Sequence, residues 1–269
     1  MMSTSFTIAQ LSDTHIRIPG TPLFNGVDST IQLQKAIDWI LSDQLTIDAV
    51  VISGDLTQDG LVEEYQHLRQ LLSPLAKQMP IYLVLGNHDH FENFMQVFSD
   101  YPGIAQAKAH DALQYRVKMG DYQFLILDSL EQGNDQGHLN PQRLDWLNQQ
   151  LQDSTDKTII VIHHPMIDIG NPLMDDMHLF ESEAFGQIVE KHQHIELILC
   201  GHIHRTIFGK FKQVPVIIGP STAHQYPVNI THASAKLLSK EAPGFLIHAC
   251  VEGKSILTHQ IPISPFEKK

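Results

Sequence analysis

Short apolar runs alternate along the first hundred residues with longer segments in which apolar residues recur every three or four positions. The short runs predict buried strands, and the longer segments predict helices that place one face against a core. The expected strands lie at residues 6–11, 49–52 and 81–85, and each precedes an expected helix, at 29–45, 61–72 and 91–98. This alternation is typical of a parallel α/β sheet.

The pattern changes after residue 100, where hairpins become more frequent. Residues 113–118 and 123–127 flank a turn at 119–122 and predict a β-hairpin. The remaining expected elements are helices at 141–151 and 181–191 and strands at 158–162, 195–199, 214–218, 245–251 and 255–259. Two mixed sheets packed face to face, with helices outside, fit this order better than one doubly wound sheet.

A single domain over residues 1–269 accommodates these elements, because α/β chains of this length often form one domain. Residues 220–269 are expected to complete the sheets. Within them, residues 226–243 are expected to form a substrate lid or a dimer arm, and a homodimer or higher homo-oligomer is left open.

Composition excludes several classes of protein. With 30 Asp and Glu against 18 Lys and Arg, the net charge of −12 argues against a nucleic-acid polymer or an anionic membrane as partner. Two cysteines provide neither a disulfide framework nor a thiolate zinc cluster, so a reducing cytoplasm is the expected location. Seventeen histidines, almost as many as Lys and Arg together, direct attention to metal binding.

Potential metal ligands follow five of the expected strands. In open α/β sheets, ligands bind beyond the carboxyl ends of the strands. The strand ends carry Asp13 and His15, Asp55, Asn87 with His88, His163 with His164, and His202 with His204. Residues two apart point to the same side of an extended chain, so each such pair is expected to reach one centre. Oxygen and imidazole donors without sulfur suit Zn, Mn or Fe.

These motifs, in this order, resemble the calcineurin-like metallophosphoesterase family. They are Asp13-x-His15, Gly54-Asp55-x4-Gly60, Gly86-Asn87-His88-Asp89, His163-His164-Pro165 and Gly201-His202-x-His204. Within the family, the chain is most similar to bacterial class III cyclic nucleotide phosphodiesterases and their glycerophosphodiesterase relatives. Residues 12–17, 63–66 and 221–225 carry that closer similarity.

The resemblance implies a four-layer α/β/β/α sandwich with two metal ions, which are Fe, Mn or Zn. Asp13, His15 and His204 would bind the first ion, and Asp55 would bridge the two. The ligands of the second ion would be Asn87, His163 and His202. A metal-bound hydroxide would attack the phosphorus atom of the substrate.

Other residues are assigned around that centre. Asn87 and His88 would contact the substrate, with His88 as the catalytic residue that is not a ligand, and His224 is a further candidate for substrate binding. Asp89 is expected to orient His88. His164 is expected to point away from its neighbour, and its role is either supporting or catalytic.

The expected substrate is a small phosphodiester. Protein phosphatases of the superfamily carry an arginine before the closing glycine of the second motif, where this chain has Asp59, so a monoanionic diester is favoured over a dianionic monoester. We predict hydrolysis of 3′,5′-cyclic nucleotides, cAMP first, to 5′-nucleotides. The alternatives are a glycerophosphodiester phosphodiesterase and a non-catalytic scaffold with the same fold.

Overall fold

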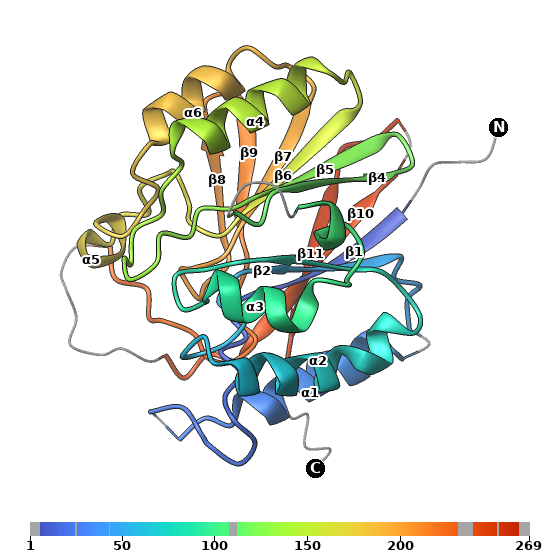
Figure 1. The fold of residues 1–269 in the computed structure, drawn as a ribbon, viewed down its shortest axis with the longest axis vertical. Coiled ribbons are helices and arrows are strands. Elements are labelled where there is room, and N and C mark those ends of the chain that lie inside the picture. Colours follow the sequence, from blue (N-terminus) through green and yellow to red (C-terminus); the bar gives the residue numbers. More distant parts are fainter. Residues whose placement is uncertain are drawn as a thin grey trace.

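The structure is a computed structural model that describes residues 6–24, 26–42, 44–107, 112–230, 239–251 and 253–263. Two β-sheets face each other in the middle of the molecule, and helices lie on the outer side of each sheet (Figure 1). The expected α/β/β/α sandwich is therefore confirmed. Among the described helices, none combines the length and the apolar character needed to cross a bilayer.

The first sheet has the strand order β11-β10-β1-β2-β3. Strands β1, β2 and β3 are parallel to one another, whereas β10 pairs antiparallel with β1 and β11 pairs antiparallel with β10. The strands are β1 (Phe6–Leu11), β2 (Ala49–Ser53), β3 (Ile81–Val84), β10 (Gly244–Cys250) and β11 (Leu257–Pro262). The helices on its outer face are α1 (Ser29–Ile40), α2 (Val62–Ala76) and α3 (Phe91–Phe98).

The second sheet has the order β4-β5-β6-β7-β9-β8, and the predicted hairpin forms β4 and β5. Its strands are β4 (Tyr115–Met119), β5 (Tyr122–Leu127), β6 (Lys157–Ile162), β7 (Ile195–Cys200), β8 (Ile207–Phe211) and β9 (Val214–Ile218). The 3-10 helix Ile104–Gln106 precedes this sheet in the chain. The helices in this part of the chain are α4 (Pro141–Gln152), α5 (Pro172–Asp175) and α6 (Ser182–Val189).

Several boundaries differ from the sequence prediction. Helix α1 ends at Ile40 rather than at residue 45, and α2 continues through Pro74 to Ala76. Strand β8 was not predicted, because it has no fully buried position and therefore lacks an apolar run. The expected lid or dimer arm at residues 226–243 includes residues 231–238, which lie outside the described residues.

Continuous apolar runs reflect burial on both faces of a strand. In β6, Ile159 and Val161 belong to the core that includes the first sheet, whereas Ile160 and Ile162 belong to the core beneath α4 and α6. Burial of each such side chain contributes about 1.5–3 kcal/mol. The two cores hold the sheets and helices in place, so the strand ends form a rigid support for the loops that follow them.

A chain of buried polar side chains links the two sheets below those loops. The Gln10 amide donates to Ser53 Oγ at 3.0 Å and to the Cys200 carbonyl, on the other sheet, at 2.9 Å. The Gln10 oxygen lies 2.9 Å from His248 Nε2, and His248 Nδ1 lies 2.9 Å from Thr258 Oγ1. A neutral imidazole that donates from Nε2 and accepts at Nδ1 satisfies both contacts.

We predict that His248 makes the protein sensitive to acid. Burial lowers the pKa of His248 to about 3, whereas an unfolded chain protonates this histidine near its ordinary value of 6.5. Protons therefore favour the unfolded state as the pH falls from about 6.5 towards 3, at up to about 1.4 kcal/mol per pH unit. Urea unfolding between pH 7 and 4.5 should show a shallower loss of stability for His248→Gln than for the wild type. The control is His259→Gln, at an exposed position on β11, and equal slopes in all three proteins would contradict the prediction.

Candidate dinuclear metal site

All the candidate ligands follow the carboxyl ends of parallel strands. The loops after β1, β2 and β3 come from the first sheet, and those after β6 and β7 come from the second. Backbone hydrogen bonds join the loops to one another. Asp13 donates to the Gly54 carbonyl at 3.0 Å, His15 donates to the Asp55 carbonyl at 3.0 Å, and Gly201 donates to the His163 carbonyl at 3.0 Å.

Four of the candidate ligands form a first cluster. One ligand atom from each of Asp13, His15, Asp55 and His204 lies within 4.8 Å of those of the others, and all four residues are buried. The Nε2 atoms of His15 and His204 are 2.9 Å apart. His204 Nε2 lies 3.5 Å from Asp13 Oδ1, and His15 Nε2 lies 3.7 Å from Asp55 Oδ2.

The second cluster lies on the other side of Asp55. His163 Nε2 lies 3.2 Å from Asn87 Oδ1 and 3.4 Å from Asp55 Oδ2, and His202 Nδ1 lies 3.0 Å from Asn87 Oδ1. Asp55 Oδ2 thus contacts a histidine of each cluster. The structure brings together all seven residues predicted as metal ligands and places Asp55 between the two groups.

The ligand loops are not extended, contrary to the expectation for pairs two residues apart. The φ angles are +49° at Asp13, +44° at His15, +48° at Asp55, +72° at His202 and +51° at His204. These angles fall in the left-handed region, which non-glycine residues seldom adopt. Among the described residues only Lys212 shares this property outside glycine, so the unusual backbone is concentrated in the ligand loops.

Glycine is required where these loops approach each other. Gly54 has a φ angle of +95°, and a Cβ atom there would lie 2.2 Å from His163 Nδ1. At Gly201 a Cβ atom would lie 2.2 Å from Ser12 Oγ and 2.5 Å from the Ser53 carbonyl. A side chain at either position would therefore collide with a neighbouring loop.

Hydrogen bonds at the far side of two imidazoles orient their lone pairs into the clusters. His163 Nδ1 is 2.7 Å from the Ser53 carbonyl, and His204 Nδ1 is 3.1 Å from the His224 carbonyl. Because a carbonyl only accepts, each Nδ1 carries a proton. In the neutral ring, each Nε2 then carries a lone pair that faces the same space as the carboxylate and amide oxygens described above.

Acceptor atoms that converge in this way suit cations. Asp13 Oδ2 is also buried without a hydrogen-bond partner. Carboxylate, amide and imidazole donors bind Zn, Mn or Fe. The residues therefore fit two metal ions, one in each cluster.

The electrostatics of the clusters also favour a cation. Burial lowers the pKa of His15 and of His202 to about 3, so both imidazoles stay neutral, as ligands must be. Burial raises the pKa of Asp13 to about 7. Burial alone would also raise the pKa of Asp55, but neighbouring imidazoles, His163 first, hold it well below its usual range. The pKa of His163, which burial would lower, is raised to about 9 by the Asp55 carboxylate.

His88 lies beside the first cluster and lines a pocket of about 230 Å³. Its backbone N–H donates to Asp55 Oδ1 at 2.9 Å, and its ring packs edge-on to His15 at a centroid distance of 4.8 Å. His88 Nδ1 donates to the Gln58 carbonyl at 2.8 Å, which leaves Nε2 available. Burial would lower the pKa of His88, but Asp55 and the Gln58 carbonyl raise it above its ordinary value.

Asp89 does not orient His88, so that expectation was wrong. Its carboxylate accepts hydrogen bonds from the backbone N–H groups of Leu56, Thr57 and Gly86 at 2.9–3.2 Å and from the Tyr65 hydroxyl at 2.9 Å. Asp89 therefore ties the loop that bears Asp55 to the loop that bears Asn87 and His88.

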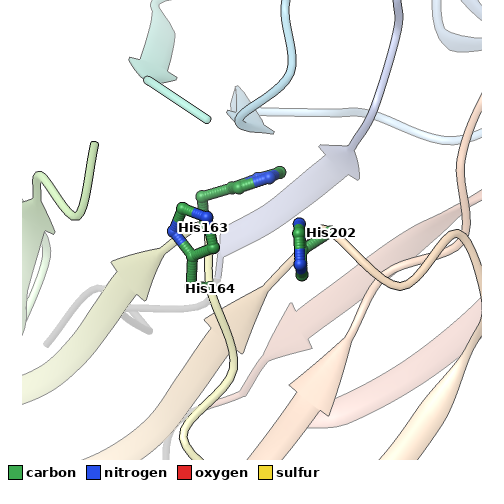
Figure 2. A group of neighbouring side chains, drawn as sticks. All are labelled: His163, His164 and His202. Carbon is green, nitrogen blue, oxygen red and sulfur yellow. The ribbon is translucent and has the colours of Figure 1, made fainter. Parts of the chain in front are cut away.

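His164 lies in the same group as its neighbour rather than pointing away. One ring nitrogen from each of His163, His164 and His202 lies within 4.8 Å of the others, and Figure 2 shows the three side chains where β6 and β7 end. His164 Nδ1 is 2.8 Å from Ser129 Oγ, and His164 Nε2 is buried without a partner. The His164 ring packs beside that of His202, with 4.7 Å between the ring centroids, and so supports the position of His202.

His224 and Tyr226 flank the first cluster. The His224 ring lies 4.5 Å from that of His204, and both its ring nitrogens are buried without a partner. His224 is not among the residues that line the pocket, so its role in substrate binding stays a prediction. Tyr226, which the sequence prediction missed, stacks on His204 at 4.5 Å and does line the pocket. Its only sequence signal is an aromatic residue two positions after His224.

Comparison with known proteins agrees with the geometry. The calcineurin-like phosphoesterase family matches residues 6–206. A probable glycerophosphodiester phosphodiesterase GpdQ from Arcobacter nitrofigilis is 29% identical and aligns over 97% of this chain and 94% of its own length. The 3′,5′-cyclic adenosine monophosphate phosphodiesterase CpdA of Escherichia coli K12 is 30% identical, over 88% of this chain and 82% of its own.

Solved structures share the fold. A dimetal phosphatase from Danio rerio superimposes with a TM-score of 0.68 at 15% identity, and the match covers 96% of this chain and 99% of that one. The protein belongs to the calcineurin-like phosphoesterase family.

We predict that Gly54→Ala empties the second cluster. The new methyl group would push the His163 ring away. The backbone at this position also has a conformation that disfavours alanine. Metal analysis should find about one ion fewer per chain than in the wild type. The control is Gly133→Ala, which has the same backbone constraint, with φ +82°, but no atom within 4 Å. If both variants bind the same number of ions, the close packing of Gly54 on His163 is not needed for metal binding.

Proposed function

We propose that the protein is a metal-dependent phosphodiesterase that hydrolyses small phosphodiesters, with 3′,5′-cyclic nucleotides, cAMP first, as substrates. The observation that carries the proposal is the pair of ligand clusters that share Asp55 and adjoin the pocket of His88. The two relatives compared above bear the names of phosphodiesterases, which supports this reaction class.

The first ion would be held by Asp13, His15 and His204, and Asp55 would bridge to the second. Asn87, His163 and His202 would complete the second site. Two ions supply Lewis acidity towards the phosphoryl oxygens and lower the pKa of a bound water towards about 7.

The charge of the site explains how an acidic protein attracts an anionic substrate. Two divalent ions bring at least four positive charges, and Asp13 and Asp55 contribute two negative ones, while the remaining ligands are neutral. The site is therefore locally positive although the chain carries a net charge of −12.

His88 acts on the substrate as a proton donor in this proposal. Its Nδ1 is held by the Gln58 carbonyl, which leaves Nε2 as the ring nitrogen that could meet a substrate, and His88 lines the pocket. A protonated Nε2 donates to the leaving oxygen as the phosphorus–oxygen bond breaks, or to a phosphoryl oxygen that gains charge. Asn87 is the other candidate for substrate contact, because it also lines the pocket.

A diester is favoured because the site offers little positive charge beyond the ions. None of the described residues that line the pocket is a lysine or an arginine. The two arginines nearest the ligand motifs are engaged elsewhere: Arg17 pairs with Asp59 at 2.9 Å, and Arg205 pairs with Glu241 at 2.6 Å. A monoanion therefore suits this pocket better than a dianionic monoester.

Glycerophosphodiesters are the second candidate, since the relative from Arcobacter nitrofigilis carries that name and aligns over nearly the whole chain. A non-catalytic scaffold is less well supported, because the full ligand set and His88 are present. The cytoplasmic location and a homodimer or higher oligomer stay predictions. Cys200 and Cys250 are free and buried, which is compatible with a reducing compartment.

A substrate panel tests the proposal. Purified protein loaded separately with Mn, Fe or Zn is incubated with cAMP, a glycerophosphodiester, a phosphomonoester and bis(4-nitrophenyl) phosphate. We expect hydrolysis of the diesters and weaker hydrolysis of the monoester. Cleavage of glycerophosphodiesters with cAMP untouched would overturn the choice of substrate. Absence of bound metal, together with no hydrolysis of bis(4-nitrophenyl) phosphate in Mn, would instead favour the scaffold.

We predict that His88→Ala lowers kcat by about 10²–10⁴, the usual effect of losing a general acid. The variant should retain both ions, because His88 is not a ligand in the proposed site. Steady-state kinetics and metal analysis of the same preparation separate the two effects. His259→Ala, at an exposed position on β11, serves as the control. Loss of metal in His88→Ala would show that His88 holds the site together rather than transferring a proton.

A further inference from the structure

Two chain segments outside the metal-ligand motifs also line the pocket. One segment begins before α5 and contributes Leu173, Met174 and Met177 to the lining. The other follows β9 and contributes Tyr226 and Pro227. These five side chains form what we call the apolar wall. The metal-ligand candidates Asp55, Asn87, His202 and His204, together with His88, line the same pocket.

The apolar wall is held in place by the site itself. The Tyr226 ring stacks on His204 with an interplanar angle of 16°. The backbone carbonyl of Tyr226 accepts a hydrogen bond from Arg205 Nη1 at 2.6 Å. Burial raises the pKa of the Tyr226 hydroxyl to about 12, so the ring stays neutral. Met174 is buried and packs in the core beneath α6, which anchors the other segment.

Few polar groups accompany the apolar wall. Beyond the ligand candidates, His88 and the Tyr226 hydroxyl, the polar side chains among the described lining residues are Asn171, Asn229 and Asp135. The Asn171 oxygen already accepts a hydrogen bond from the Leu173 N–H at 3.3 Å, and Asp135 is exposed. A hydroxylated or charged group placed against Leu173 and the two methionines would lose water without gaining equivalent partners.

We propose that the apolar wall is the subsite for the ester group of the substrate, and that it selects uncharged groups with a flat apolar body over charged or polyhydroxylated ones. The proposal rests on the proposed phosphodiesterase function, and it names what distinguishes the candidate substrates. A heteroaromatic ring can lie flat against the methionine and tyrosine side chains of the apolar wall.

The test compares two diesters that carry the same phosphate charge, cAMP and glycerophosphoethanolamine. Leu173→Asn replaces an apolar side chain of the wall with a polar one that is also branched at the γ carbon. Leu45→Asn is the matched control, because Leu173 is 45% exposed, Leu45 is 44% exposed, and Leu45 does not line the pocket. Effects on folding or on phosphate binding change kcat/KM for both substrates and cancel in their ratio.

We expect Leu173→Asn to lower the ratio of kcat/KM for cAMP to that for glycerophosphoethanolamine about five-fold, and Leu45→Asn to leave it unchanged. Met177→Asn should shift the ratio in the same direction, which guards against an effect peculiar to one position. An unchanged ratio in both wall variants, with both diesters hydrolysed, would overturn the subsite and leave the phosphodiesterase function standing. If the metal-loaded wild type hydrolyses neither diester, the function itself fails.

Discussion

Two buried carboxylates that need positive charge dominate the site. Asp13 and Asp55 lie in one cluster between the sheets, and among the described residues no lysine or arginine lines the adjoining pocket. Histidine is the nearest side chain that can supply positive charge, and the Asp55 carboxylate raises the pKa of His163 to about 9. A metal ion would neutralise the carboxylates more completely than a proton, since it would also accept the lone pairs of the imidazoles and of Asn87.

The surrounding structure serves to hold these groups where repulsion would otherwise separate them. Left-handed backbone at five ligand positions costs energy, about 1–3 kcal/mol for each strained residue. Hydrogen bonds between the loops, the Asp89 carboxylate and the polar chain through Gln10 and Ser53 offset that cost. The site is therefore prearranged by the fold, which suits a reaction in which charge must be stabilised as it develops.

Local patterns in the sequence predicted two facing mixed sheets and a gathering of polar residues at the strand ends, and the family resemblance supplied the choice of seven ligands. Apolar runs mark strands buried on two faces, and polar residues at their ends must meet at one edge of the sheets. The left-handed loops were not predicted, since the φ angles of Asp13 and His202 depend on contacts with distant loops. Tyr226 and the position of His164 were missed for the same reason: their neighbours, His204 and His202, are close in space but not in sequence.

The division of ligands between the sheets has a consequence for how the protein holds together. In the first cluster, Asp13, His15 and Asp55 follow strands of one sheet, and His204 follows a strand of the other. The second cluster likewise takes ligands from both. Neither sheet alone can assemble a complete site, so an ion bound there would link the two sheets. Its binding energy would add to the free energy of unfolding, because the two sheets could not separate without releasing it.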